Sequence, residues 1–196
     1  MITKYRFGDP LQTDAVVNEL PAATGVFPVE NVETKDGFRF TFEMGTEDIV
    51  YGLGENVRGI NKRGFRYISF CTDDPHHQED KSSLYAAHNF LIVDQPQPFG
   101  LFLDYPGKMT FDVGYTKKDV LEISCERADL DVYVLTGDSP YDIVKQFRGL
   151  IGRSYLPPRW AFGFGQSRWG YRTPEDFRKV AAGHRENGVP IDMIYM

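Results

Sequence analysis

Apolar and polar residues alternate along short segments throughout residues 1–138. Residues 37–44 and 120–125 show the period of two that a strand produces when one face is buried and the other meets solvent. Glycine, proline, asparagine and aspartate separate these segments, and no helical period lies between them. Regular short strands without helices predict an N-terminal β-sandwich domain over residues 1–138.

Two strongly apolar segments lie close together within this region. Residues 99–105 and 109–114 both have the composition of strands, and Pro106 and Gly107 separate them. Proline and glycine are typical residues of tight turns. We therefore predict that the two segments pair as a hairpin.

The period changes to that of a helix at residue 139. Ser139 and Pro140 are typical of an N-cap and a first helical turn, and Gly152 is typical of a helix end. Apolar residues recur between them at helical spacing: Ile143, Phe147, Leu150 and Ile151. Residues 139–156 are therefore predicted to form a connecting helix and linker.

The last part of the chain, residues 157–196, shows the pattern of a strand, a helix and a second strand. Residues 157–165 form an apolar run rich in glycine and phenylalanine, which is typical of a buried strand. A helix is predicted from Thr173 to Asn187, and an apolar segment follows at 189–196. The buried stripe of that helix is expected to contain Phe177, Val180 and Ala181. Short connections indicate one βαβ unit with parallel strands, which buries so little apolar surface that we expect it to be incomplete.

Charge and composition exclude several classes of protein. The chain has 196 residues, a net charge of −6 and an isoelectric point near 5.2, with no run of lysine or arginine, which argues against a nucleic-acid partner. No apolar run is long enough to span a membrane, and the first residues lack the apolar stretch of a secretory signal. We therefore expect a cytoplasmic protein with no membrane partner, in which Cys71 and Cys125 are free, buried thiols.

Polar residues gather at residues 72–81 of the predicted sandwich. This segment contains His76 and His77, and His88 follows it. Adjacent histidines point apart on an extended chain and the spacings fit zinc or calcium sites poorly, so no metal site is predicted. Four basic residues precede the segment, and we interpret them as a solvated face or as ion-pair donors to the following domain: Arg58, Lys62, Arg63 and Arg66.

Several motifs occur in the same order as in a known family. Residues 50–55 are Val-Tyr-Gly-Leu-Gly-Glu, residues 84–90 are Leu-Tyr-Ala-Ala-His-Asn-Phe, and residues 99–104 are Phe-Gly-Leu-Phe-Leu-Asp. Together with residues 157–171 and 191–196, they resemble glycoside hydrolase family 31, the α-glucosidase family. The likeness is to its YGLGE turn, its LYGSHPF strand, the next strand, and the entry into its catalytic barrel. In the second motif, alanine replaces both glycine and serine, and asparagine replaces proline.

The resemblance implies a mainly β fold, in which a β-sandwich precedes the first βαβ unit, residues 157–196, of a (β/α)8 TIM barrel. It implies a retaining, exo-acting α-glucosidase that hydrolyses terminal α-linked glucose of oligosaccharides, with one aspartate as nucleophile and another as general acid/base. Both lie beyond the second barrel strand, so no catalytic residue is expected in this chain, which should be inactive without the rest of the barrel. Two carboxylates and water suffice for the reaction, so no cofactor is expected. Whether the protein forms a homo-oligomer stays open.

Five residues are the predicted substrate contacts: Trp169, Arg168, Tyr171, Asp73 and Asp74. Trp169 follows the carboxyl end of the first barrel strand, where barrel sites are built, and its indole can cover the C–H face of a sugar. Packing of the loop is the alternative role of Trp169, and a structural ion pair is that of Arg168. The resemblance places the segment of Asp73 and Asp74 over the barrel mouth, where a carboxylate accepts two hydroxyls. An ordinary turn is the alternative there.

Two other functions stay open. A non-catalytic carbohydrate-binding or scaffold module would need only the sandwich, and residues 157–196 disfavour it because their pattern is that of a barrel. A family member acting on another α-glycoside, such as a xyloside or a galactoside, is the second alternative. Asp192 begins the second barrel strand, on the face that serves stability, and is not expected in the site.

Overall fold

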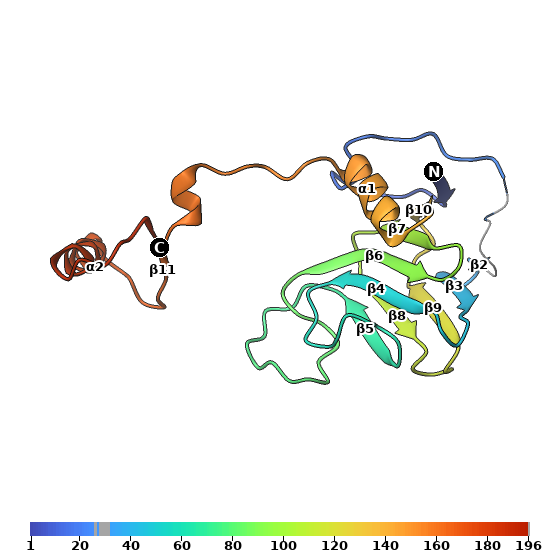
Figure 1. The fold of residues 1–196 in the computed structure, drawn as a ribbon, viewed down its shortest axis with the longest axis horizontal. Helices are drawn as coiled ribbons and strands as arrows, with labels where there is room; N and C mark the ends of the chain where they lie inside the picture. The colour runs from blue at the N-terminus through green and yellow to red at the C-terminus, as the bar shows by residue number, and fades with distance from the viewer. Residues whose placement is uncertain (26, 28–31, 196) are drawn as a thin grey trace. The chain divides into compact units, whose positions relative to one another are not determined.

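The structure is a computed structural model that describes residues 1–25, 27 and 32–195. The chain divides into two compact units, Met1–Arg153 and Ser154–Met196. In Figure 1 the first unit is a body of strands with the helix α1, and the second unit contains the helix α2. Each unit has its own fold.

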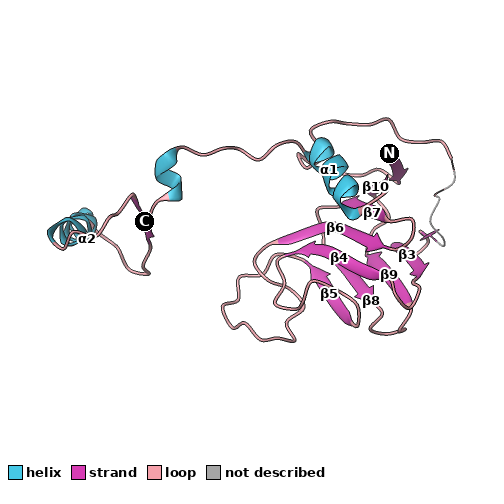
Figure 2. Cartoon of the chain, viewed as in Figure 1, coloured by secondary structure: helices cyan, strands magenta, loops and turns pink. Residues whose placement is uncertain are grey.

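Two five-stranded antiparallel sheets make up the first unit among the described residues. The first sheet has the strand order β1 (Ile2–Phe7), β10 (Leu130–Thr136), β7 (Phe99–Asp104), β6 (Ala87–Asp94) and β4 (Ile49–Gly54). The second has the order β2 (Val32–Glu33), β3 (Phe38–Glu43), β9 (Val120–Cys125), β8 (Met109–Val113) and β5 (Phe65–Ser69). Figure 2 shows these strands in magenta. The predicted β-sandwich is confirmed.

The core of the sandwich lies between the two sheets. Phe38 and Phe40 of β3 are each 1% exposed, whereas Arg39 between them is exposed to solvent. Leu91 and Leu101 join the same apolar cluster from the other sheet. Burying a side chain of this size contributes about 1.5–3 kcal/mol. The alternation in the sequence therefore produces the face that holds the sheets together.

The predicted hairpin across Pro106 and Gly107 is wrong. β7 pairs with β6 and β10 in the first sheet, whereas β8 pairs with β5 and β9 in the second. Leu103 of β7 and Phe111 of β8 both enter the core from opposite sides. Two strands that face one core from opposite sides belong to different sheets, so the turn carries the chain from one sheet to the other.

The helix α1 (Pro140–Ile151) covers the outer face of the first sheet. The Ser139 side chain accepts a hydrogen bond from the Asp142 N–H at 3.2 Å. Phe147 stacks on Phe90 of β6 with ring centroids 3.8 Å apart. The helix predicted from residue 139 is confirmed, and it is part of the first unit because one of its faces is buried on the sheet.

Gly100 of β7 lies directly beneath α1. A Cβ at this position would lie 2.6 Å from Cγ2 of Ile143, which is closer than carbon atoms approach one another. Ile143 is fully buried and belongs to the second apolar cluster, between the first sheet and the helix. The absence of a side chain at Gly100 therefore lets the helix lie close to the sheet.

Three consecutive residues of β4 have positive φ angles. These angles are 115° at Gly52, 66° at Leu53 and 73° at Gly54, and the pairing with β6 is irregular there. A Cβ at Gly52 would overlap the carbonyl oxygen of Phe90. The glycines of the motif at residues 50–55 thus permit both the backbone conformation and the close approach to β6.

The second unit contains one short 3₁₀-helix, one α-helix and two short strands among its described residues. These are η1 (Arg159–Phe162), β11 (Gly165–Gln166), α2 (Pro174–Glu186) and β12 (Met193–Ile194). β11 and β12 pair in parallel, as predicted, with Gly165 opposite Met193. Met196, the last residue of the predicted second strand, lies outside the described residues.

The prediction of a buried strand over residues 157–165 is wrong. Residues 159–162 of this run form η1, after which the Gly163 N–H donates to the Trp160 carbonyl at 3.0 Å. Trp160, Phe162 and Phe164 are 55%, 69% and 49% exposed. Among the described residues β12 is the sole strand that pairs here, and Ala161 and Gly163 donate to carbonyls three residues earlier instead of to a sheet.

The predicted start of α2 is confirmed. Thr173 accepts a hydrogen bond from the Asp176 N–H, and the Asp176 carboxylate accepts one from the Thr173 N–H at 2.9 Å, which forms a capping box. The helix ends before Asn187, as predicted. Its expected buried stripe is only partly buried in this unit: Phe177, Val180 and Ala181.

Both cysteines are free, but only one is shielded from solvent. Cys71 is exposed, so the prediction that it is buried is wrong, and Cys125 is half-buried. Cys71 lies two residues beyond Ser69, the last residue of β5, and so outside the alternating part of that strand. Among the described residues, no helix combines the length and the apolarity that crossing a bilayer requires.

The four basic residues at positions 58–66 stabilise the sandwich locally. Arg63 donates to the carbonyl of Asp48 at 2.9 Å and to the carboxylate of Asp119 at 3.0 Å. Lys62 is 6% exposed, and burial lowers its pKa. The prediction of a solvated face is therefore wrong for Lys62, because its stem packs into the fold and its ammonium group binds the Gly59 carbonyl at 2.9 Å.

Candidate functional site

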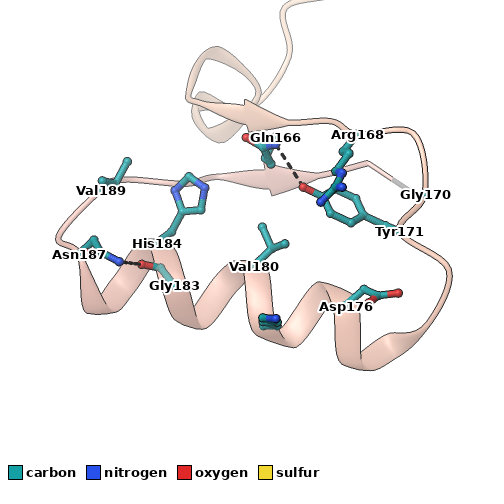
Figure 3. Close-up of a pocket in the computed structure, with 11 residues that line it drawn as sticks. Gln166, Arg168, Gly170, Tyr171, Asp176, Val180, Gly183, His184, Asn187 and Val189 are labelled. Carbon is teal, nitrogen blue, oxygen red and sulfur yellow. Dashed lines mark hydrogen bonds between the residues drawn. The ribbon is translucent and has the colours of Figure 1, made fainter.

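The segment after β11 carries the polar and aromatic residues predicted for the site. Gln166 ends the strand, and its Nε2 donates a hydrogen bond to the Tyr171 hydroxyl at 3.1 Å. The Tyr171 ring packs against Phe177 of α2, with centroids 5.5 Å apart. Figure 3 shows Gln166 and Tyr171 joined in this way. Tyr171 is thus held between the strand and the helix.

Trp169 differs from Tyr171 in its surroundings. Its side chain is fully exposed, so both faces of the indole are accessible within this unit. Gly170 next to it has a φ of 115°, which favours glycine and turns the chain toward α2. Trp169 thus follows β11 and has a free aromatic face, and its contact with a sugar stays a prediction.

Arg168 is near Tyr171 at the same end of β11, as Figure 3 shows. In the part of the chain that the structure describes, it forms no ion pair, and its alternative role as an ion-pair partner within the complete barrel stays a prediction. Its guanidinium carries five N–H donors.

A hollow of about 760 Å³ lies between α2 and the strand pair. Arg168 and Tyr171 line one end, and the remainder is lined mainly by Val180, Gly183 and His184 of the helix (Figure 3). Nδ1 of His184 is buried and has no hydrogen-bond partner among the described residues. Since barrel sites form at the carboxyl ends of the strands, only the end with Arg168 and Tyr171 corresponds to the predicted site.

The loop after β5 contains the two predicted carboxylates. Asp74 forms an ion pair with Nζ of Lys81 at 2.8 Å, and its Oδ1 accepts a hydrogen bond from the His76 N–H at 3.0 Å. These interactions hold the pKa of Asp74 below its ordinary value, the hydrogen bond from Lys81 being the larger cause. Asp74 therefore shapes the loop, which corresponds to its alternative role as a turn residue.

Asp73 is exposed, and none of the hydrogen bonds found among the described residues involves its side chain. Of the two carboxylates, it is the one that is available to a ligand. Asp73 and Asp74 are in the first unit, and the other three predicted contacts are in the second. The structure therefore groups Trp169, Arg168 and Tyr171 on one segment and the two aspartates on one loop.

Within residues 1–25, 27 and 32–195, no group of three histidine, cysteine, aspartate or glutamate side chains could hold a metal ion. His77 packs instead against Tyr85, with ring centroids 5.8 Å apart.

One contact near the site was not found from the sequence. The Asp192 carboxylate accepts a hydrogen bond from the Phe164 N–H at 3.1 Å, immediately before β11. The signal in the sequence was Gly163, since a glycine inside an apolar run marks a place where another group comes close to the backbone. Nothing in the sequence identified Asp192 as that group, because 28 residues separate it from Phe164.

Both units match profiles of one enzyme family. Residues 11–112 match the "Glycosyl hydrolase 31 N-terminal galactose mutarotase-like domain". Residues 154–196 match the "Glycosyl hydrolases family 31 TIM-barrel domain". The second match begins where the second unit begins.

Individual proteins show the same likeness. Alpha-glucosidase 2 of Bacillus thermoamyloliquefaciens is 36% identical over 175 residues, which is 84% of this chain and 22% of that protein. Alpha-xylosidase XylQ of Lactiplantibacillus pentosus is 27% identical over 169 residues, or 84% of this chain and 21% of the relative. A family 31 dextranase of Flavobacterium johnsoniae, solved with isomaltotriose, has a TM-score of 0.74 and 24% identity over 95% of this chain and 21% of its own, which shows a shared fold. The chain thus spans about a fifth of the length of these proteins.

Proposed function

Because this chain belongs to glycosyl hydrolase family 31, we propose that it is part of a retaining, exo-acting α-glucosidase that releases terminal α-linked glucose from oligosaccharides. The observation that carries the proposal is the 36% identity with an alpha-glucosidase over 84% of the chain. The match of residues 154–196 to the TIM-barrel domain disfavours a binding or scaffold module, which would not need a barrel.

Trp169 is the main sugar contact that we propose in this chain. An exposed indole after a barrel strand can cover the apolar C–H face of a glucose ring. Arg168 beside it has donors for sugar hydroxyls, and Tyr171 is held in place by Gln166. This segment would then form one wall of the glucose pocket.

Asp73 is the second proposed contact. Its carboxylate can accept hydrogen bonds from two neighbouring hydroxyls, and charged acceptors form stronger bonds than neutral ones. Asp74 supports it by holding the loop through Lys81. The two aspartates thus have different roles in the proposal, the first in binding and the second in loop structure.

The reaction needs two carboxylates on opposite sides of the glycosidic bond. One attacks the anomeric carbon, while the other protonates the leaving oxygen and later activates water, so the released glucose retains its configuration. Both would be supplied by other strands of the barrel, and no cofactor takes part. We expect the 196 residues alone to have no activity.

The full-length protein tests the proposal with p-nitrophenyl α-glucoside and maltose. We expect hydrolysis in which NMR detects α-glucose as the first product. W169A should lower kcat/KM about tenfold by removing the aromatic face, and D73N should lower it about tenfold or more by removing a charged acceptor. Y141A, which changes an aromatic residue of α1 that is 76% exposed, is the control and should leave kcat/KM unchanged.

A second candidate is an α-xylosidase, since an alpha-xylosidase is 27% identical to this chain. Parallel assays with p-nitrophenyl α-xyloside separate the two. A higher kcat/KM for the xyloside would overturn the glucose specificity, and β-glucose as the first product would overturn the retaining mechanism. Absence of hydrolysis of every α-glycoside, together with glucose or maltose binding to the 196-residue chain, would favour the binding module.

A further inference from the structure

Asp192 contacts the backbone just before β11, apart from the segment that carries the proposed sugar contacts. Its Oδ2 accepts a hydrogen bond from the Phe164 N–H at 3.1 Å. The Asp192 N–H donates in return to the Phe164 carbonyl at 2.9 Å. Asp192 therefore binds both polar backbone groups of one residue, with its side chain and its own backbone.

Gly163 provides the space for this carboxylate. A Cβ at Gly163 would overlap the carboxyl group of Asp192. The φ of Gly163 is −87°, which any residue can adopt, so the glycine is required for space and not for backbone freedom. Gly165 likewise leaves space for the ring of Tyr195, because a Cβ at Gly165 would lie 3.1 Å from that ring.

The contact lies where β11 and β12 begin to pair. The parallel register places Gly165 opposite Met193 and Gln166 opposite Ile194. With so short a ladder, one additional hydrogen bond from a carboxylate contributes strongly to the register. Trp169 follows Phe164 by five positions, at most about 17 Å along an extended chain, so a shift of β11 also moves the segment after it.

We infer that Asp192 is a positioning residue for the proposed sugar contacts: it fixes β11 by holding the Phe164 N–H, and so determines where Arg168 and Trp169 stand. The inference rests on the proposed α-glucosidase function and gives Asp192 a part in substrate binding beyond the stability expected from its place in the chain. Asp192 does not touch the substrate in this arrangement.

Steady-state kinetics of the full-length protein with maltose test the inference. D192A should lower kcat/KM about tenfold or more, because a small displacement of a residue that contacts the substrate lowers the rate by at least that factor. D192N should stay within about twofold of wild type, since an amide oxygen accepts the same hydrogen bond. G163A should reproduce the D192A defect, because its methyl group displaces the carboxylate. E186A, at the exposed end of α2, is the matched carboxylate control and should have no effect.

A double-mutant cycle with W169A separates positioning from general stability. If Asp192 acts through Trp169, D192A should lower kcat/KM by no more than about twofold in the W169A background. Equal defects in both backgrounds would overturn the inference, as would a D192A enzyme that loses thermal stability but keeps the wild-type KM and kcat. A defect in D192N as large as that in D192A would also contradict it.

The two proposals fail in different ways. If wild type does not hydrolyse α-glucosides, or if W169A has wild-type kinetics, the proposed function or its tryptophan contact is wrong, and the role of Asp192 is overturned with it. If wild type is active and W169A is impaired, but D192A is unchanged, only the positioning role is wrong.

Discussion

Lys4 and Asp131 form an ion pair between β1 and β10 that is almost entirely removed from solvent. Nζ of Lys4 lies 2.9 Å from Oδ2 of Asp131, and the two side chains are 4% and 8% exposed. Arg6 binds the same carboxylate through Nε and Nη2, each at 2.8 Å. Since β1 is at the edge of its sheet, this carboxylate fixes the register of the edge strand.

Asp131→Ala is expected to destabilise the sandwich by about 2–3 kcal/mol, because it removes one of the two carboxylates that bind the buried ammonium group of Lys4 and leaves only Glu19. Urea denaturation of the 196-residue chain, followed by circular dichroism, measures the change. The matched control is R127A, which removes an ion pair with Asp129 at the surface, where the arginine side chain is 73% exposed. The control should change stability by less than about 1 kcal/mol. Equal effects of the two variants would contradict the importance of burial here.

The same carboxylate predicts a dependence of stability on pH. Burial opposes ionisation of Asp131, but hydrogen bonds from Arg6 and Lys4 outweigh it and hold its pKa below the ordinary value. A lowered pKa in the folded state gives stability that is complete above the pKa of the unfolded chain, about 3.9, and is lost as the pH falls through the folded value. The difference in unfolding free energy between wild type and D131N should therefore be constant from pH 7 to about pH 5 and shrink below about pH 4. A difference that is unchanged at pH 2.5 would exclude this linkage.

Gly100, beneath α1, and Gly149, on the exposed side of that helix, should respond to alanine in opposite directions. Gly100→Ala places a methyl group against Ile143 and should destabilise the first unit by about 1–3 kcal/mol. Gly149→Ala, in α1, meets open space and should stabilise it by about 0.5–1 kcal/mol through helix propensity. Urea midpoints of the two variants measure both effects. A G100A protein as stable as wild type would mean that α1 can move away from the sheet without lowering the free energy of unfolding.

The two thiols should differ in reactivity. Burial raises the pKa of the Cys125 thiol to about 11, so roughly one molecule in a thousand carries a thiolate there at pH 8. Cys71 is exposed. A maleimide reagent should thus modify one thiol per folded chain and two per chain in urea, and mass spectrometry of peptides should locate the first at Cys71. Rapid labelling of Cys125 in the folded chain would contradict its shielding.

The helices could be predicted from the sequence because their signals are local. Ser139 and Thr173 each cap a helix within three residues, and the structure has both caps. Strand pairing depends on partners that are distant in the chain, so the turn at Pro106 was recognised but its two strands were assigned to one sheet instead of two. The prediction of a buried strand at residues 157–165 was wrong for a related reason. An apolar composition leads to a buried strand only when neighbouring strands are present to pair with it.

In the candidate site, too, local features could be predicted from the sequence and contacts between distant segments could not. The position of Trp169 after a strand could be predicted, because strand and loop are adjacent in the sequence. The different surroundings of Asp73 and Asp74 could not, since they depend on where Lys81 folds back. The contact of Asp192 with Phe164 required two distant segments to meet, and only the glycine at position 163 gave any sign of it.

Both tryptophans of this chain, Trp160 and Trp169, lie in the second unit, and the β-sandwich has none. Tryptophan fluorescence therefore observes the η1–β11–α2 segment alone, whereas circular dichroism is dominated by the strands of the sandwich. The two parts of the molecule thus carry separate optical signals without any added label. Unfolding of the sandwich, and burial of the exposed indoles by a sugar or by further barrel strands, can be followed independently in one sample.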